Sequence, residues 1–180
     1  MTIPAVQAET AEFLLRLTGA APIETHISAV YVGADAAYKL KKAVRLTFLD
    51  FTALAVRERL LRHELAINAP HAPSLYRAVH PITRSPDGHL QLDGEGTPIE
   101  WVLEMAPLGP EAFLHDQAVH SGLSPSLLDS LGDAVAAMHE ALAPVHGWDV
   151  TCAMTRVIEG NSRAALAAGL PTARITLWAE

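Results

Sequence analysis

The sequence is poor in the residues that mark several classes of protein. Cys152 is the single cysteine among 180 residues, so no internal disulfide can form, and a cytoplasmic setting is expected. The net charge of -7 excludes the dense basic field that binds nucleic acid without sequence preference, and it disfavours an anionic membrane surface. Apolar runs are short and interrupted by Arg, Glu or His, so we expect no segment that spans a bilayer.

Motifs for metal binding and for nucleophilic catalysis are also missing. Nine histidines are present, but none has the spacing of H-E-x-x-H or of a comparable zinc motif, so no metal site is expected. Neither a P-loop nor a G-x-S-x-G elbow occurs. Cys152 has only His146 nearby in the sequence, and we do not expect it to be a nucleophile.

Lysine is scarce and confined to one place. Of the 13 basic residues, only Lys39, Lys41 and Lys42 are lysines, and all lie in one short segment. A compact ammonium suits a point contact with a phosphate, whereas the arginine guanidinium is a bulky planar fork. The alternative explanation is a strand edge that is protected from pairing by solvated charge.

Hydrophobic periodicity and turn residues predict the order of the elements. The sequence predicts a helix that ends near Gly19, strands and a second helix that begins after the N-cap Thr52, more strands, and then only helices. The expected helices and strands are 7–17, 23–32, 37–44, 53–68, 75–83, 90–92, 99–105, 111–119, 125–142 and 155–168. Strands followed by helices indicate an α+β protein with a boundary near residues 104–110.

Alternation along the strand at 37–44 separates two faces. Ala37, Lys39 and Lys41 lie on one face, and Tyr38 and Leu40 lie on the other. The small Ala37 leaves space above the lysine face for a ligand.

Glu64 lies at the edge of the apolar stripe of the helix at 53–68. A buried carboxylate needs a cation, because an unpaired buried charge is expensive, so we expect Glu64 to pair with Lys39. Three alternatives stay open: Lys41 is the important lysine, Glu58 is the partner, or Glu64 is exposed beside a helical arginine.

The helix at 125–142 carries apolar residues at roughly helical spacing. They are Leu127, Leu128, Leu131, Val135, Met138 and Leu142. We expect this helix to be less completely buried than the core around Leu61 and Leu65.

Several segments resemble the aminoglycoside phosphotransferase-like kinases. Residues 37–42 resemble the third strand of these enzymes, and residues 61–68 resemble the helix that supplies its carboxylate. Residues 100–105 resemble the strand that leads into the interlobe hinge, and residues 131–140 resemble the first long helix of the large lobe. The stretches at 24–28 and 48–51, together with the lysine segment, are similar to a bacterial group in which such a domain precedes a P-loop ATP-binding domain.

The resemblance implies an α+β fold of the protein-kinase-like type: a small lobe at 1–105, then the hinge and the first helices of a large lobe at 106–180. It implies that Lys39 binds ATP phosphates, that Glu64 pairs with this lysine, and that the Glu104 carbonyl and the Ala106 amide contact adenine. ATP with Mg²⁺ would be the cofactor, and a hydroxyl of a small molecule would accept the γ-phosphate.

Three departures from the family pattern limit what the resemblance implies. No glycine-rich loop precedes Lys39, although Thr25 and Ser28 offer hydroxyls for a phosphate-covering turn. The catalytic His-Gly-Asp loop is missing, and Asp50-Phe51 continues into Thr52, so it cannot serve as the metal-binding motif. We therefore expect the catalytic residues and the Mg²⁺ ligands to lie outside this chain.

Two other interpretations remain open at this point. The chain could be a non-catalytic nucleotide-binding or interaction module, or an unrelated α+β scaffold in which Lys39 and Glu64 lie far apart. The sequence does not identify the acceptor substrate.

Overall fold

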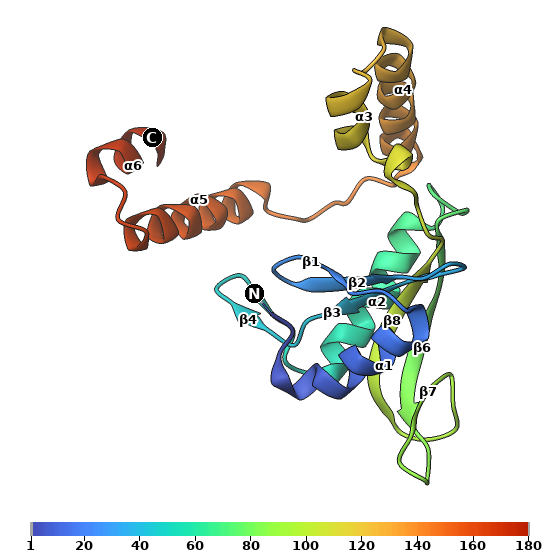
Figure 1. Cartoon of the computed structure of the whole chain (residues 1–180). Coiled ribbons are helices and arrows are strands. Elements are labelled where there is room, and N and C mark those ends of the chain that lie inside the picture. Colours follow the sequence, from blue (N-terminus) through green and yellow to red (C-terminus); the bar gives the residue numbers. More distant parts are fainter. Residues whose placement is uncertain (1, 180) are drawn as a thin grey trace. The chain divides into compact units, whose positions relative to one another are not determined.

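A computed structural model describes residues 2–179, which divide into two compact units between Asp129 and Ser130. The α+β class is confirmed: a six-stranded antiparallel sheet with a packing helix is followed by a helical C-terminal half (Figure 1). None of the helices within residues 2–179 combines the length and the apolar character that a membrane crossing requires.

The sheet has the strand order β1-β2-β3-β8-β6-β7, and all neighbours are antiparallel. Its strands are β1 (Ile23–Glu24), β2 (Ser28–Val32), β3 (Ala37–Lys41), β6 (Tyr76–Arg84), β7 (Leu90–Leu92) and β8 (Pro98–Met105). A separate hairpin, which the sequence analysis did not predict, consists of β4 (Arg45–Leu46) and β5 (Leu49–Asp50). The helical elements of this part are η1 (Ala5–Gln7), α1 (Ala8–Thr18), α2 (Leu54–Asn68), η2 (Pro110–Ala112) and α3 (Leu114–His120).

The C-terminal cap of α1 is the one that the sequence predicts, whereas the N-terminal cap of α2 is not. Gly19 caps α1 in the left-handed conformation with φ of 73°, which glycine adopts without a steric penalty. Thr52 is not the N-cap of α2, because its hydroxyl donates to Asp50 and the helix begins one residue later, with Ala53 as its cap.

One face of the sheet packs on α1. Leu14 of α1, Tyr31 of β2, Leu40 of β3 and Val102 of β8 are almost completely buried in one cluster. Burying a large aliphatic side chain stabilises the fold by roughly 1.5–3 kcal/mol, so this cluster is the main apolar contribution on this face.

The other face of the sheet meets α2. Leu61 of α2 and Leu103 of β8 are fully buried, and Lys39 and Lys41 of β3 reach Glu64 of α2. Since Leu40 faces α1 and its neighbours in the strand face α2, the two helices lie against opposite faces of the sheet.

A buried polar cluster joins α2 to the sheet. The guanidinium of Arg57 donates to both carboxylate oxygens of Glu100, at 2.8–3.1 Å, and to the carbonyl of Phe51 at 2.8 Å. Gln7 Nε2 donates to Glu100 at 2.7 Å and to the carbonyl of Lys41 at 3.0 Å. The side chains of Arg57 and Glu100 are 7% and 1% exposed, so each charge depends on its partners.

The C-terminal half consists of α4 (Pro125–Ala141), α5 (Val150–Ala167) and α6 (Thr172–Ala179). Helix α5 begins earlier than predicted because Asp149 caps it and accepts from the amide of Cys152 at 2.8 Å. Helix α6 was not predicted. On α4, Leu128, Leu131 and Val135 are 39–48% exposed, and Leu142, which follows the helix, is 53% exposed, whereas Leu61 is fully buried. Leu65 is only partly buried, as are Leu127 and Met138, so the expected difference in burial holds against Leu61 and not against Leu65.

We predict that Glu100→Gln lowers the free energy of unfolding by about 3–5 kcal/mol, because it leaves the buried guanidinium of Arg57 without a counter-charge. Urea denaturation followed by far-UV circular dichroism measures the change. Glu12→Gln is the matched control, because Glu12 forms an exposed ion pair with Arg16, and the expected loss is at most about 1 kcal/mol. Equal effects of the two substitutions would contradict the prediction.

We further predict that the purified chain binds a hydrophobic dye through the apolar face of α4. The double substitution Leu131→Ser, Val135→Ser should lower dye fluorescence and light scattering, because it removes two exposed apolar side chains from this face. The control on the same helix, Ala134→Ser with Ala136→Ser, should leave both signals unchanged. Unchanged dye binding in the Leu131/Val135 variant would place the dye elsewhere.

Candidate functional site

The candidate site centres on the carboxylate of Glu64, which two lysines share. Lys39 Nζ donates to Glu64 Oε1 at 2.5 Å, and Lys41 Nζ donates to Glu64 Oε2 at 2.8 Å. The expected pairing of Lys39 with Glu64 is confirmed. From the sequence the two lysines are rivals for this role, whereas in the structure both bind the same carboxylate.

The other side chains considered for this ion pair, Glu58 in place of Glu64 and a helical arginine in place of Lys39, are engaged elsewhere. Glu58 accepts from Arg62 at 2.9 Å on the exposed side of α2, and Arg57 binds Glu100. Arg62 also lies over the ring of Trp101, 4.7 Å from its centroid. The interpretations in which Glu58 is the partner, or Glu64 stands beside a helical arginine, are therefore wrong for this structure.

Strand β3 and helix α2 position the three charged groups. Lys39 and Lys41 lie two residues apart on one face of β3, and Lys39 pairs in register with the buried Leu103 of β8. On α2, Arg57, Leu61, Glu64 and Asn68 follow the spacing of one helical face, so Glu64 lies two turns beyond the arginine that is fixed to Glu100.

The two lysines differ in exposure. The side chain of Lys39 is 25% exposed, whereas that of Lys41 is 9% exposed and lies over the ring of Phe51, 5.6 Å from its centroid. Lys39 is therefore the lysine that an incoming anion can reach. With one carboxylate and two ammonium groups, the site carries one positive charge in excess.

The two lysines stabilise the ionised form of Glu64. Burial by itself raises the pKa of Glu64, but hydrogen bonds and charge from Lys39 and Lys41 outweigh this effect and hold the pKa below its ordinary value of 4.5. The carboxylate is therefore charged at neutral pH and can orient both lysines.

The two residues of the β1–β2 turn that were considered for phosphate binding differ in exposure: Thr25 is exposed, with its hydroxyl hydrogen-bonded within the turn, and Ser28 is buried. Thr25 Oγ1 donates to the carbonyl of Ser28 at 3.3 Å and accepts from the amide of Ser28 at 3.0 Å, and Ser28 is buried. Lys42 is fully buried and ties this turn to the end of β3, because its Nζ donates to Glu24 Oε2 and to the carbonyl of Thr25, both at 2.7 Å. The alternation of side chains along residues 37–44 does not predict this contact.

The predicted hinge residues lie at the end of β8. The amide of Ala106 donates to the carbonyl of Leu75 at 2.8 Å, so an adenine contact at this amide would have to replace that hydrogen bond. The Glu104 side chain binds Arg77 at 2.9 Å and the ring Nε2 of His80 at 2.8 Å. The nucleotide contacts of Glu104 and Ala106 stay predictions.

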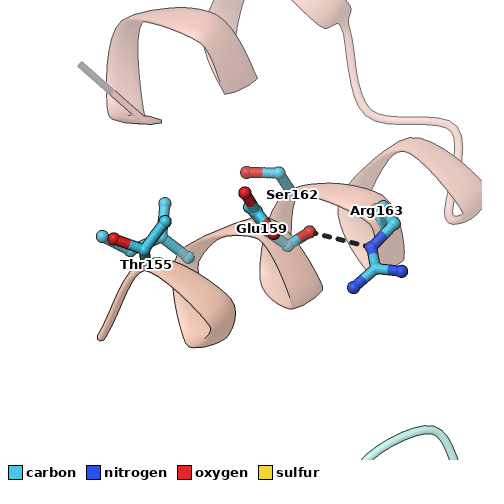
Figure 2. Close-up of a pocket in the computed structure, with 5 residues that line it drawn as sticks. Thr155, Glu159, Ser162 and Arg163 are labelled. Atoms are coloured by element: carbon cyan, nitrogen blue, oxygen red, sulfur yellow. Dashed lines mark hydrogen bonds between the residues drawn. The ribbon is translucent and has the colours of Figure 1, made fainter. Parts of the chain in front are cut away.

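The helical half contains a hollow of about 720 Å³ that is lined by Thr155, Ile158, Glu159, Ser162 and Arg163 of α5. Figure 2 shows Arg163 turned along the helix, where its Nε donates to the main-chain carbonyl of Glu159 at 3.3 Å. All five residues belong to one helix, and the hollow is broadly open. The Glu64 site is the better candidate because its charged groups are partly or fully buried and converge from two elements.

Neither a metal-binding cluster nor a similarity to a known protein points to a function. Within residues 2–179, no group of three or more His, Cys, Asp or Glu residues could hold a metal ion. Comparison of the chain with protein-family models, with curated proteins and with solved structures gives no match. The geometry of the Glu64 site is therefore the observation that bears on function.

We predict that Glu64 makes folding stability depend on acid pH. Because its pKa is lower in the folded chain than in the unfolded chain, its contribution is complete above the ordinary value of 4.5 and is lost as pH falls through the folded pKa. Glu64→Gln should therefore flatten the loss of stability below about pH 4.5, measured by urea unfolding at a series of pH values. Glu58→Gln, at the exposed pair on the same helix, should keep the wild-type pH profile.

Proposed function

We propose that this chain is the ATP-binding part of a small-molecule phosphotransferase with a protein-kinase-like fold. The sheet and α2 form its small lobe, and residues from 106 onward form the hinge and the first helices of its large lobe. In the complete reaction, the γ-phosphate of ATP is transferred to a hydroxyl of a small molecule. The proposal gives this chain the binding of the nucleotide and leaves the chemical step to residues outside it.

The observation that carries the proposal is the ion pair between Lys39 and Glu64. In protein kinases, a lysine on the third strand of the small lobe pairs with a glutamate on the following helix, and the pair must be formed for phosphoryl transfer. Here Lys39 lies on β3, and Glu64 lies on α2, the helix that follows β3 after the short β4–β5 hairpin. Lys39 Nζ and Glu64 Oε1 are 2.5 Å apart. The pair joins residues 25 positions apart in the chain, so local sequence does not create it.

The strand order also supports the proposal. Strand β8 lies directly beside β3, and Lys39 pairs in register with Leu103. Strand β8 ends at Met105, and Pro107 and Gly109 follow it, so the segment expected to serve as the hinge begins beside the lysine strand. A nucleotide with its phosphates at Lys39 could therefore have its base near residues 104–106.

The residues present fit the phosphates of ATP better than they fit its metal. The excess positive charge and the 25% exposure of Lys39 suit a phosphate oxygen. Mg²⁺ would be bound by one or two carboxylates together with water and phosphate oxygens, and the sequence lacks the His-Gly-Asp loop and the metal-binding Asp motif that the family uses. We therefore place the Mg²⁺ ligands, together with the residue that orients the acceptor hydroxyl, outside this chain.

We predict that the chain binds ATP and that Lys39→Met weakens binding at least tenfold, because it removes a charge-assisted hydrogen bond to a phosphate. Isothermal titration calorimetry at low salt measures the affinity. Arg45→Met is the control, since it removes one positive charge from an exposed pair on β4. ATP binding of equal strength by wild type and the Lys39 variant would contradict the proposed site.

A further inference from the structure

We propose that this site recognises its phosphate donor by the polyphosphate and not by the base, so that purine and pyrimidine nucleoside triphosphates bind with similar affinity. This inference rests on the function proposed above and names the class of donor that the site accepts. Its basis is the direction of the main-chain groups at the end of β8, beside the strand that carries Lys39.

The main-chain groups at the end of β8 point alternately toward β6 and toward β3, as in any antiparallel sheet. The amide of Ala106 donates to the carbonyl of Leu75, directly before β6, at 2.8 Å. Ala106 therefore faces β6, and so does Glu104, two residues earlier. The Glu104 carbonyl and the Ala106 amide, which were predicted to contact adenine, thus lie on the edge of β8 that β6 occupies.

Hydrogen bonds on the side of β3 give the same assignment. The carbonyl of Ala36 accepts from the amide of Gly33 at 2.9 Å across the turn between β2 and β3, so Ala36 faces β2. Its neighbour Ala37 faces the opposite way, toward β8, where it pairs in register with Met105. The main-chain groups of Met105 are therefore directed at β3.

The edge of β8 that faces β3 continues into Pro107. Strand β3 begins at Ala37, the register partner of Met105, so no strand of the described sheet lies beside this edge beyond Met105. The alternation reaches Pro107 because the residue before a proline favours extended backbone. Proline has no main-chain N–H. A base beside the end of β8 therefore meets an edge without the donor that a ring nitrogen of adenine would accept from.

The side chains that flank Lys39 on its face of the sheet are apolar. Residues that pair in register share a face, which places Val30, Ala37, Leu103 and Met105 on the face of Lys39. An apolar surface favours the burial of any base, because the hydrophobic effect depends on area and not on direction. These side chains hold a base without reading its hydrogen-bonding edge.

Lys39 supplies the polyphosphate with the kind of contact that this edge does not offer to the base. Its ammonium has three donors, and the bond to Glu64 Oε1 uses one of them, so the ion pair stays formed while a phosphate oxygen accepts another. A hydrogen bond from an ammonium to a phosphate is charge-assisted and roughly twice as strong as a neutral one. The contact is the same for every nucleoside triphosphate.

The test measures the affinity of the chain for ATP, GTP, UTP and sodium tripolyphosphate by isothermal titration calorimetry at low salt. ATP and GTP are the matched pair, because their rings have the same size, while adenine carries a donor amino group where guanine carries an acceptor oxygen. We expect the three nucleotides to bind within about fivefold of one another, which is less than one good hydrogen bond contributes. Lys39→Met should weaken all four ligands about tenfold.

A variant at Pro107 tests the edge of β8 directly. Pro107→Ala restores an N–H on the edge that faces β3, so the affinity for ATP relative to tripolyphosphate should rise about two- to tenfold, the effect of one added hydrogen bond. Pro98→Ala, at the other end of the same strand, is the matched control and should leave this ratio unchanged.

The outcomes separate this inference from the proposed function. A chain that binds none of the four ligands overturns both. Lys39-dependent binding in which two nucleotides differ by more than about fivefold overturns only the inference, because another main-chain group, such as the amide of Leu108, would then read the base. A ratio of ATP to tripolyphosphate affinity that is unchanged in Pro107→Ala also overturns it, because the base would then lie away from this edge.

Discussion

The buried carboxylate of Glu100 is the constraint on which the rest of the sheet-containing unit depends. A charge that is 1% exposed must be compensated: Arg57 on α2 supplies the counter-charge, and Gln7 of η1 donates a further hydrogen bond. Each of these side chains also binds the backbone of another segment: Arg57 binds the carbonyl of Phe51, and Gln7 binds the carbonyl of Lys41. The carboxylate of Glu100 therefore holds three segments against β8: η1, the end of β3 and the start of α2.

The candidate site follows from this constraint. Because α2 is rigid and Arg57 is fixed at its start, Glu64 is placed two turns further along the same face, opposite the lysines of β3. The lysine face of β3 is available for chemistry because the other face is occupied, with Leu40 buried against Leu14 of α1. An apolar core on one face and an ionic site on the other thus share a single strand of five residues.

The two lysines of the site lie at different depths below the surface. The deeper lysine, Lys41, is 9% exposed, and the shallower lysine, Lys39, is 25% exposed. Such a gradient suits a polyphosphate ligand, which can bind the shallow ammonium while the deep one keeps the carboxylate charged.

The sequence by itself determined the features that depend on local periodicity and on turn residues. The two-residue alternation of β3, the end of α1 at Gly19 and the succession of strands and then helices could all be predicted. The pairing of Lys39 with Glu64 was expected on a different ground, the cost of an unpaired buried carboxylate, and Lys41 and Glu58 stayed open as alternatives. The tertiary structure alone decided that Lys41 shares Glu64 and that Gln7 meets Glu100 across 93 positions of the chain. It also decided that the amide of Ala106 binds Leu75. Such contacts leave no periodic signal, because a hydrogen-bonding side chain finds its partner only after the strands and helices have packed.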